Sequence, residues 1–291
     1  MKICAGIVLY NPDAGRLKKS IDAISPQVDQ LVFIDNASDN IEKLQKEFDD
    51  DGFVWIKNEI NKGIATALNQ LAEFAKNNEY EWILTLDQDS ICQESFVKKL
   101  IEAVPENEND AGGKKIAMAG PLIIDRGIAD SDVRKDKPMP DSEEVKLCIT
   151  SGCLTNVKAI QDIGGFNDWL FVYDVDREIC IRLLRGGYRL IRVNTTSLCH
   201  EHGLKTVTKK VLWKNVVYRN YTPASVYYMT RNLVYMLRKY GKEYAPSPFL
   251  RWIRLYIAFG VKFICEPDRI QRLKAFSKGI KDGLAVNINE V

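Results

Sequence analysis

The sequence of 291 residues is long enough for one large α/β domain with an appendage, and its 46% hydrophobic and 27% charged residues are ordinary for a folded globular protein. No apolar run reaches the ~18 residues of a membrane-spanning helix, so no transmembrane helix is predicted. The first residues lack the layout of a signal peptide, so none is predicted either. The net charge of +2 hides an asymmetry, because residues 1–203 carry 24 basic and 34 acidic side chains whereas residues 204–291 carry 17 and 5.

Apolar runs alternate with helical patterns along the first hundred residues. The predicted strands are Lys2–Leu9, Leu31–Ile34, Phe53–Lys57 and Trp82–Leu86. The predicted helices run from Asp13 to about Ser25 and over Ile41–Phe48, Gly63–Asn77 and Ser95–Val104. This order predicts a doubly wound, mainly parallel sheet, which binds ligands at the carboxyl ends of its strands.

The pattern continues less regularly after residue 104. Further strands are predicted at Ile116–Ile124, Val145–Thr150 and Tyr188–Val193, and helices at Val157–Ile163 and Asp176–Arg185. From Val207 onward the pattern becomes helical and aromatic, and Phe249–Cys265 has the period of an amphipathic helix with a basic polar face. We therefore expect one domain at residues 1–203 and a basic, aromatic helical extension at residues 204–291.

The seven cysteines are scattered and form no CxxC pair. Five of them lie in or beside apolar runs: Cys4, Cys92, Cys148, Cys153 and Cys180. An odd number in such positions predicts mostly buried thiols in the reducing cytosol.

Asp87-Gln88-Asp89 follows the fourth predicted strand directly. Two carboxylates separated by one residue at the end of a buried strand suit a divalent cation and a nucleotide diphosphate, because Mg²⁺ takes oxygen ligands and bridges carboxylates to phosphates. The tripeptide alone would also fit a solvated turn. Asp35 ends another strand, where its carboxylate could accept the imide N–H of uracil or thymine, or cap the turn that follows.

Other polar residues stand at helix starts or near the last strand. Asn61 could cap the helix that begins at Gly63, and this helix start would favour a diphosphate. Glu178 and Arg182 are four residues apart and are expected to pair, which makes Asp176 available as a general base. His200 and His202 are two apart in an extended segment, so at most one of them is expected to face a site.

These motifs occur in a characteristic order: Ile7–Asn11, Val32–Ser38, Asn61–Ala65 with Asn69, Leu84–Ser90, Ser151-Gly152, Gly164–Asn167, Val175–Glu178 with Cys180 and Arg182, and His200 with Gly203. This ordered set of motifs resembles that of the family-2 glycosyltransferases of the GT-A fold. It most resembles the bacterial rhamnosyltransferase branch, which builds O-antigen and other surface polysaccharides. The resemblance covers residues 3–203 and continues weakly into the tail, through Tyr227-Tyr228, Arg231-Asn232 and 279–283.

The resemblance implies roles for individual residues. Asp35 would bind the base of the nucleotide, Asp87 would lie near ribose and metal, and Asp89 would ligate Mg²⁺ or Mn²⁺. Asp176 would deprotonate an acceptor hydroxyl for attack with inversion. His200 is placed near the metal, although the branch usually has one histidine here and this chain has two. The remaining implied residues contact the nucleotide-sugar (Tyr10, Asn11, Asn36, Asn61, Gly63, Asn69) or support the acceptor side (Ser151, Gly152, Glu178, Arg182, His202).

The implied activity is transfer of a sugar, with rhamnose favoured, from a dTDP- or UDP-sugar to a glycan carried on polyprenyl diphosphate. The basic, aromatic tail suits the anionic inner face of the cell membrane, which implies a cytoplasmic protein that associates peripherally. Alternatively, the tail helices pack on the sheet domain or form a homodimer.

Two other classes of function compete with this one. A nucleotidyltransferase would need a loop rich in Gly and Arg after the first strand, and Tyr10–Asp13 does not supply it. A non-enzymatic protein could grip an anionic surface, but aromatics on one helical face suit lipid or a core better than nucleic acid. The sequence contains no GxGxxG, Walker A, HExxH or GxSxG motif, which argues against dinucleotide redox, NTPase and common hydrolase chemistry.

Overall fold

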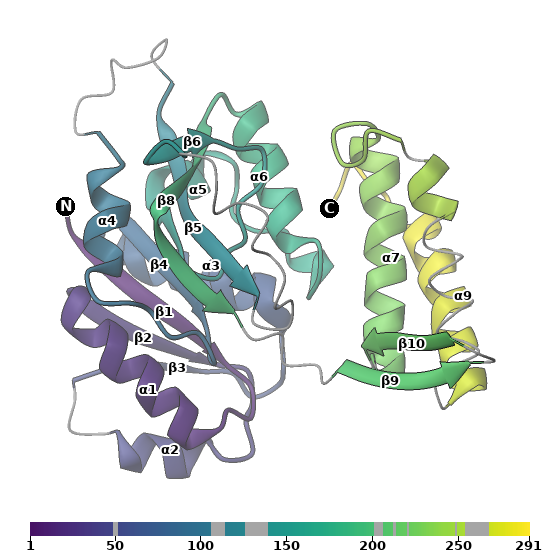
Figure 1. Cartoon of the computed structure of the whole chain (residues 1–291), viewed down its shortest axis with the longest axis horizontal. Helices are drawn as coiled ribbons and strands as arrows, with labels where there is room; N and C mark the ends of the chain where they lie inside the picture. The colour runs from purple at the N-terminus through teal and green to yellow at the C-terminus, as the bar shows by residue number, and fades with distance from the viewer. Residues whose placement is uncertain are drawn as a thin grey trace. The chain divides into compact units, whose positions relative to one another are not determined.

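The computed structural model of the chain describes residues 1–48, 52–105, 114–125, 139–200, 206–211, 214–219, 221–247, 249–253 and 268–291. The chain forms two compact units, drawn in Figure 1. The first consists of Met1–Phe171 and Val175–Glu201, and the second of Val172–Asp174 and His202–Val291. The second unit thus includes a three-residue segment that interrupts the first unit immediately before a helix.

The first unit is built on one eight-stranded sheet with the strand order β3-β2-β1-β4-β7-β5-β8-β6. Its strands are β1 (Ile3–Leu9), β2 (Gln30–Asp35), β3 (Val54–Lys57), β4 (Trp82–Asp87), β5 (Ile116–Asp125), β6 (Ser142–Glu144), β7 (Cys153–Asn156) and β8 (Arg189–His200). Strands β1 to β4 pair in parallel, and β5 is parallel to β8. Strand β7 is antiparallel to β4 and β5, and β6 is antiparallel to β8. The sheet is therefore mainly parallel, as predicted.

Helices cover both faces of this sheet (Figure 1). They are α1 (Ala14–Ile24), α2 (Ile41–Glu47), α3 (Gly63–Asn77), α4 (Phe96–Glu102), α5 (Val157–Asp162) and α6 (Val175–Arg185). On one face, Ile7 of β1 shares a buried core with Leu17 of α1 and Phe96 of α4. On the other, Gly6 lies so close to α3 that an added Cβ would be 2.2 Å from Leu71 Cδ2. Because successive strand residues point to opposite faces, these contacts confirm the doubly wound α/β architecture.

The predicted elements before residue 105 all occur, within two residues of their predicted bounds. The predicted strand Val145–Thr150 is wrong, because these residues form a loop between β6 and β7. The Val145 N–H donates to the Leu190 carbonyl and the Thr150 N–H to the Asp176 side chain, so the loop does not pair along one strand. The last predicted strand ends too early. Its pairing with β5 shifts register after Val193, and the strand then continues to His200. A bulge of this kind interrupts the alternation from which strand length is predicted.

The second unit begins with a hairpin rather than with the predicted helix. Strands β9 (Thr206–Val211) and β10 (Lys214–Arg219) pair antiparallel, and helices α7 (Pro223–Tyr240) and α9 (Arg269–Ala285) follow. The hairpin is rich in Thr and Val, whose branched side chains favour strands. Of the amphipathic helix predicted over Phe249–Cys265, residues 249–253 are helical and the rest lies outside the described residues. No described helix is both long and apolar enough to cross a membrane.

Helices α7 and α9 pack at close range. A Cβ added at Gly279 would lie 2.8 Å from the Tyr227 carbonyl oxygen, and one added at Gly283 would lie 2.7 Å from that of Arg231. Two glycines one turn apart therefore let the backbone of α9 touch α7.

The five cysteines that were predicted to be buried are buried. Cys4, Cys92, Cys148, Cys153 and Cys180 are free thiols in the core. Burial raises the pKa of Cys4 and of Cys92 to about 12, because a thiolate is poorly solvated there. Such thiols are inert packing groups rather than nucleophiles.

Candidate active site

The Asp87-Gln88-Asp89 turn lies at the carboxyl end of β4, with Asp87 as the last residue of the strand. The Gln88 side chain pairs with the main chain of Tyr10, accepting from its N–H at 2.8 Å and donating to its carbonyl at 3.3 Å. Arg16 of α1 donates to the Asp89 carbonyl through Nε and Nη2, each at 3.2 Å. The turn is thus fastened to the end of β1 and to α1. This role of Gln88 cannot be predicted from the sequence, because a side chain bonding to a residue 78 positions away leaves no local signal.

The Thr150-Ser151-Gly152 loop fastens the same turn from the other side. Ser151 Oγ accepts from the Asp87 N–H at 3.2 Å and lies 2.9 Å from Ser90 Oγ. The Gly152 N–H donates to the Thr85 carbonyl on β4 at 2.7 Å. Both predicted support residues, Ser151 and Gly152, therefore lie against the end of β4.

Asp176 is the second residue of α6 and is held by the same loop. Its Oδ1 accepts two hydrogen bonds from Thr150, one from the main-chain N–H at 3.0 Å and one from Oγ1 at 2.7 Å. The Thr150 carbonyl in turn accepts from the Thr85 hydroxyl. A continuous set of hydrogen bonds therefore joins Asp176 to β4, the strand that carries Asp87. Thr150 is not among the predicted site residues, because the sequence pattern places it in a strand.

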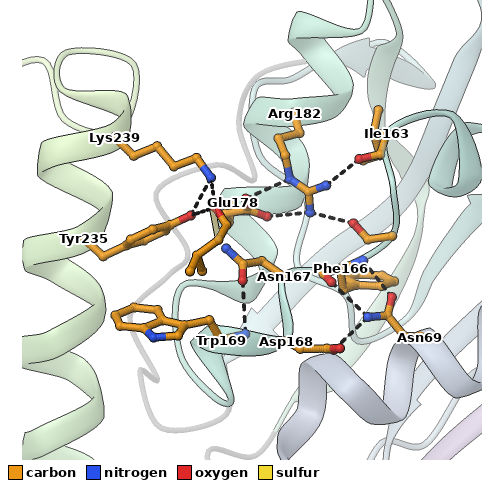
Figure 2. Close-up of polar contacts among 12 residues, drawn as sticks. Asn69, Ile163, Phe166, Asn167, Asp168, Trp169, Glu178, Arg182, Tyr235 and Lys239 are labelled. Atoms are coloured by element: carbon orange, nitrogen blue, oxygen red, sulfur yellow. Dashed lines mark hydrogen bonds and ion pairs between the residues drawn. The ribbon is translucent and has the colours of Figure 1, made fainter. Parts of the chain in front are cut away.

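Glu178 and Arg182 form the predicted pair on α6, shown in Figure 2. Arg182 Nε and Nη2 donate to the two Glu178 carboxylate oxygens at 2.8 and 2.7 Å, and the Glu178 side chain is 1% exposed. The guanidinium also donates to the carbonyls of Ile163 at 2.8 Å and Gly165 at 2.6 Å. Because a buried ion pair is tolerated when its remaining hydrogen bonds are satisfied, this pair anchors α6 to the Gly164-Gly165 turn.

Asn69 holds the other side of that turn (Figure 2). Its side-chain oxygen accepts from the Phe166 N–H at 2.7 Å, and its Nδ2 donates to the Phe166 carbonyl at 2.9 Å and to Asp168 Oδ1 at 2.7 Å. Gly165 has φ +82, and a Cβ there would lie 2.7 Å from Asn69 Oδ1. These contacts explain Asn69 and Gly165 as structural residues of the turn.

Asp35 ends β2 and is 1% exposed. In register, β1 lies between β2 and β4, with Leu9 opposite Asp35 and Val8 opposite Asp87. The strand spacing puts the two aspartates on one edge of the sheet, roughly 10 Å apart at the backbone. The Ser38 N–H donates to both Asp35 oxygens, at 3.2 and 3.1 Å, so the expected turn-capping contact is present.

The residues around Asp35 brace one another. Asn11 bonds to the turn after β2 in two ways: its Oδ1 accepts from the Asp39 N–H, and its main-chain N–H donates to the Ser38 hydroxyl oxygen, both at 2.8 Å. The Asn36 side chain donates to the Gly63 carbonyl and accepts from Asn58, both at 3.1 Å. The ends of β1 and β2 and the start of α3 therefore form one hydrogen-bonded rim.

The amino terminus of α3 is held by two contacts within the protein. Asn61 Oδ1 accepts from the Gly63 N–H at 2.9 Å, and the Phe171 carbonyl accepts from the Ile64 N–H at 2.7 Å. Gly63 has φ +83, and a Cβ there would lie 2.5 Å from the Phe171 carbonyl oxygen. The close neighbour of Gly63 is therefore Phe171. The N–H groups of Gly63 and Ile64, at the helix start that was expected to favour a diphosphate, donate to Asn61 and Phe171 in this structure.

A divalent cation would find two carboxylates at Asp87 and Asp89. The predicted third ligand, His200, is the last residue of β8, opposite Asp125 of β5, and His202 lies outside the described residues. Within the described segments, no group of three or more His, Cys, Asp or Glu side chains is arranged to hold a metal. Two carboxylates fit a cation such as Mg²⁺, which usually takes its other ligands from water and substrate phosphates.

Comparisons with known proteins agree on one family. The model of glycosyl transferase family 2 matches residues 4–118, and that of glycosyl transferase family group 2 matches residues 82–263. The sequence is 28% identical over 249 residues to the dTDP-rhamnosyl transferase RfbF of Shigella flexneri, covering 81% of this chain and 80% of that protein.

Two solved structures share the fold. GalNAc-T7 with UDP, GalNAc and Mn²⁺ has a TM-score of 0.64 at 13% identity, over 97% of this chain and 56% of the other, so this chain spans about half of that one. TarS residues 1–349 from S. aureus in complex with UDP-GlcNAc has a TM-score of 0.57 at 12% identity, over 98% of this chain and 81% of the other. Both are glycosyltransferases of the GT-A fold, and at this identity the likeness shows the fold alone.

Proposed function

The chain belongs to the family-2 glycosyltransferases, and from that premise we propose that it transfers a sugar, with rhamnose favoured, from a dTDP- or UDP-sugar to a hydroxyl of a bacterial surface polysaccharide. The relative RfbF is a dTDP-rhamnosyl transferase, and TarS was solved with UDP-GlcNAc, which supports a nucleotide-sugar donor. The observation that carries the proposal is the hydrogen-bonded link from Asp176 through Thr150 to the strand that ends in Asp87.

In the proposed reaction Asp176 is the general base. Its carboxylate takes the proton of the acceptor hydroxyl as that oxygen attacks the anomeric carbon from the face opposite the diphosphate. The new glycosidic C–O bond forms while the bond to the nucleoside diphosphate breaks, and the diphosphate leaves with the electron pair, so the configuration inverts. Two hydrogen bonds from Thr150 fix the position of the base, and such positioning lowers the barrier by supplying orientation in advance.

We propose that Asp87 and Asp89 hold Mg²⁺ or Mn²⁺. When bound, the cation would neutralise charge on the departing diphosphate. The contacts of Gln88 and Arg16 with this turn favour a rigid placement of both carboxylates.

We place the nucleotide at the edge formed by the ends of β1, β2 and β4. Asp35 would accept from the base, and the Tyr10 ring, 52% exposed, is accessible for contact with it. Asn36, Asn61 and Gly63 make contacts that brace this edge, and Asn69 braces the turn before α6, so we assign all four to shaping the site.

The second unit supports a proposed contact with an anionic membrane that carries a polyprenyl-diphosphate-linked acceptor. The face of α9 opposite Gly279 and Gly283 presents exposed apolar side chains beside lysines: Ile270, Leu273 and Leu284 with Lys274 and Lys281. Apolar side chains that enter an interface, flanked by lysines, are typical of helices that lie on anionic lipid. The alternative to membrane contact is that a second copy of the chain packs on this face of α9.

Replacing Asp176 with Asn should lower kcat about 10²–10⁴-fold, because the amide cannot take the proton. The affinity for dTDP or UDP, measured by calorimetry, should stay within about twofold, because the side chain keeps its shape. Asp162→Asn, the same change at an exposed position of α5, should leave kcat unchanged. Turnover retained in Asp176→Asn would remove this residue from its role.

Replacing Asp89 with Ala should weaken nucleotide binding in the presence of Mn²⁺ by tenfold or more and have little effect in EDTA. The main-chain contacts of the turn do not use this carboxylate, so the circular dichroism spectrum should be unchanged. Asp22→Ala, on the exposed side of α1, is the control. Equal Mn²⁺ dependence in Asp89→Ala and the control would contradict the metal site.

Replacing Ile270 and Leu284 with Ser should reduce flotation of the protein with phosphatidylglycerol vesicles several-fold, since both side chains would enter the lipid. Ile60→Ser, an equally exposed change in the first unit, should leave flotation unchanged. Unchanged flotation of the double variant, together with loss of a dimer in light scattering, would assign the α9 face to self-association.

A further inference from the structure

The segment that leads into α6 has an unusual backbone. Phe171, Tyr173 and Asp174 have φ values of 63, 64 and 58, in the left-handed region, and none of them is glycine. Each such residue is strained and persists only where its surroundings hold it. Because α6 begins at Val175 and Asp176 is its second residue, the position of the Asp176 carboxylate depends on what holds this segment.

Asn232 of α7 holds the middle of the segment. Its Nδ2 donates to the carbonyls of Val172 at 2.6 Å and Tyr173 at 2.9 Å, and the residue is fully buried. Its side-chain oxygen accepts from Nε and Nη2 of the neighbouring Arg231, at 3.0 and 2.9 Å. The guanidinium therefore fixes which end of the amide faces the segment, and both amide hydrogens serve its carbonyls.

Tyr244 holds the end of the segment. Its hydroxyl donates to Asp174 Oδ1 at 2.8 Å and accepts from Arg251 Nη2 at 2.8 Å. Burial, together with the Asp174 carboxylate, raises the pKa of Tyr244, so the phenol remains a proton donor at neutral pH. Two side chains of the second unit thus bond three successive residues just before α6.

We propose that Asn232 is a positioning residue for Asp176, and that Tyr244 is a second support of the same kind. Without the Asn232 donors, the partly buried carbonyls of Val172 and Tyr173 would lose these hydrogen bonds, and the left-handed segment would relax toward ordinary backbone angles. The start of α6 would then shift relative to Thr150, and a displacement of about 1 Å in a reacting group costs on the order of 100-fold in rate. The second unit therefore contributes to catalysis through the backbone of α6, whatever acceptor or membrane it also binds. This inference rests on the proposed role of Asp176.

The test is Asn232→Asp, which keeps the size of the side chain but removes its donors. We expect kcat to fall 10–100-fold while the donor KM and the Kd for nucleotide stay within about twofold. Hydrogen exchange should become faster in the peptide that spans residues 171–178. Lowering the pH should raise the ratio of variant to wild-type kcat, because a protonated carboxyl regains one O–H donor. Asn289→Asp, an exposed change in the same unit, is the control and should match wild type in all four measurements.

Wild-type kcat in a folded Asn232→Asp would overturn the inference, as would a loss of kcat with unchanged exchange in residues 171–178. If Asn232→Asp fails to fold, Tyr244→Phe decides instead. It should fold and lose kcat several-fold at constant donor KM, and an unchanged kcat would overturn the inference. A failure here is distinct from a failure of the proposed function: in the first case Asp176→Asn is inactive and Asn232→Asp is normal, and in the second Asp176→Asn remains active.

Discussion

The two hydrogen bonds from Thr150 to the Asp176 carboxylate are the contact on which the rest of the candidate site depends. The carboxylate lies near the start of a helix, whereas Asp87 ends β4 and Asp89 follows it, 89 and 87 residues earlier in the sequence. The Thr150-Ser151-Gly152 loop touches both. Its threonine holds Asp176, and its serine accepts from the Asp87 N–H. One short loop therefore sets the position of Asp176, the proposed base, relative to the strand end that carries the proposed metal-binding carboxylates.

Three further groups of contacts hold α6 and the segment before it. The buried Glu178–Arg182 pair anchors the helix to the Gly164-Gly165 turn, and Asn69 anchors that turn to α3. The Ile64 N–H holds the Phe171 carbonyl, and Asn232 holds the next two carbonyls. These hydrogen bonds and the ion pair all help to position the carboxylate of Asp176, the proposed base. Such support is expected where catalysis depends on fixed geometry.

Sequence patterns predicted the parts of this arrangement that have a local signal. Strands β1 to β4 are continuous apolar runs, and α3 has a clear helical period, so their bounds were predicted closely. The Glu178–Arg182 pair followed from a spacing of four residues on a helix. Thr150 could not be found in this way, because its partner is 26 residues away and its loop resembles a strand in composition. The same holds for Gln88 and Tyr10, and for the Phe171 carbonyl that occupies the start of α3. Such contacts are created by the tertiary fold and leave no periodic pattern.

If Thr150 positions Asp176 as the proposed base, single-turnover rates of sugar transfer will depend directly on the Thr150 hydroxyl. Thr150→Val removes the hydroxyl donor at nearly constant volume, whereas Thr150→Ser keeps it. We expect Thr150→Val to lower the single-turnover rate about tenfold with unchanged nucleotide affinity, and Thr150→Ser to keep most of the wild-type rate. Equal rates for wild type and Thr150→Val would contradict it.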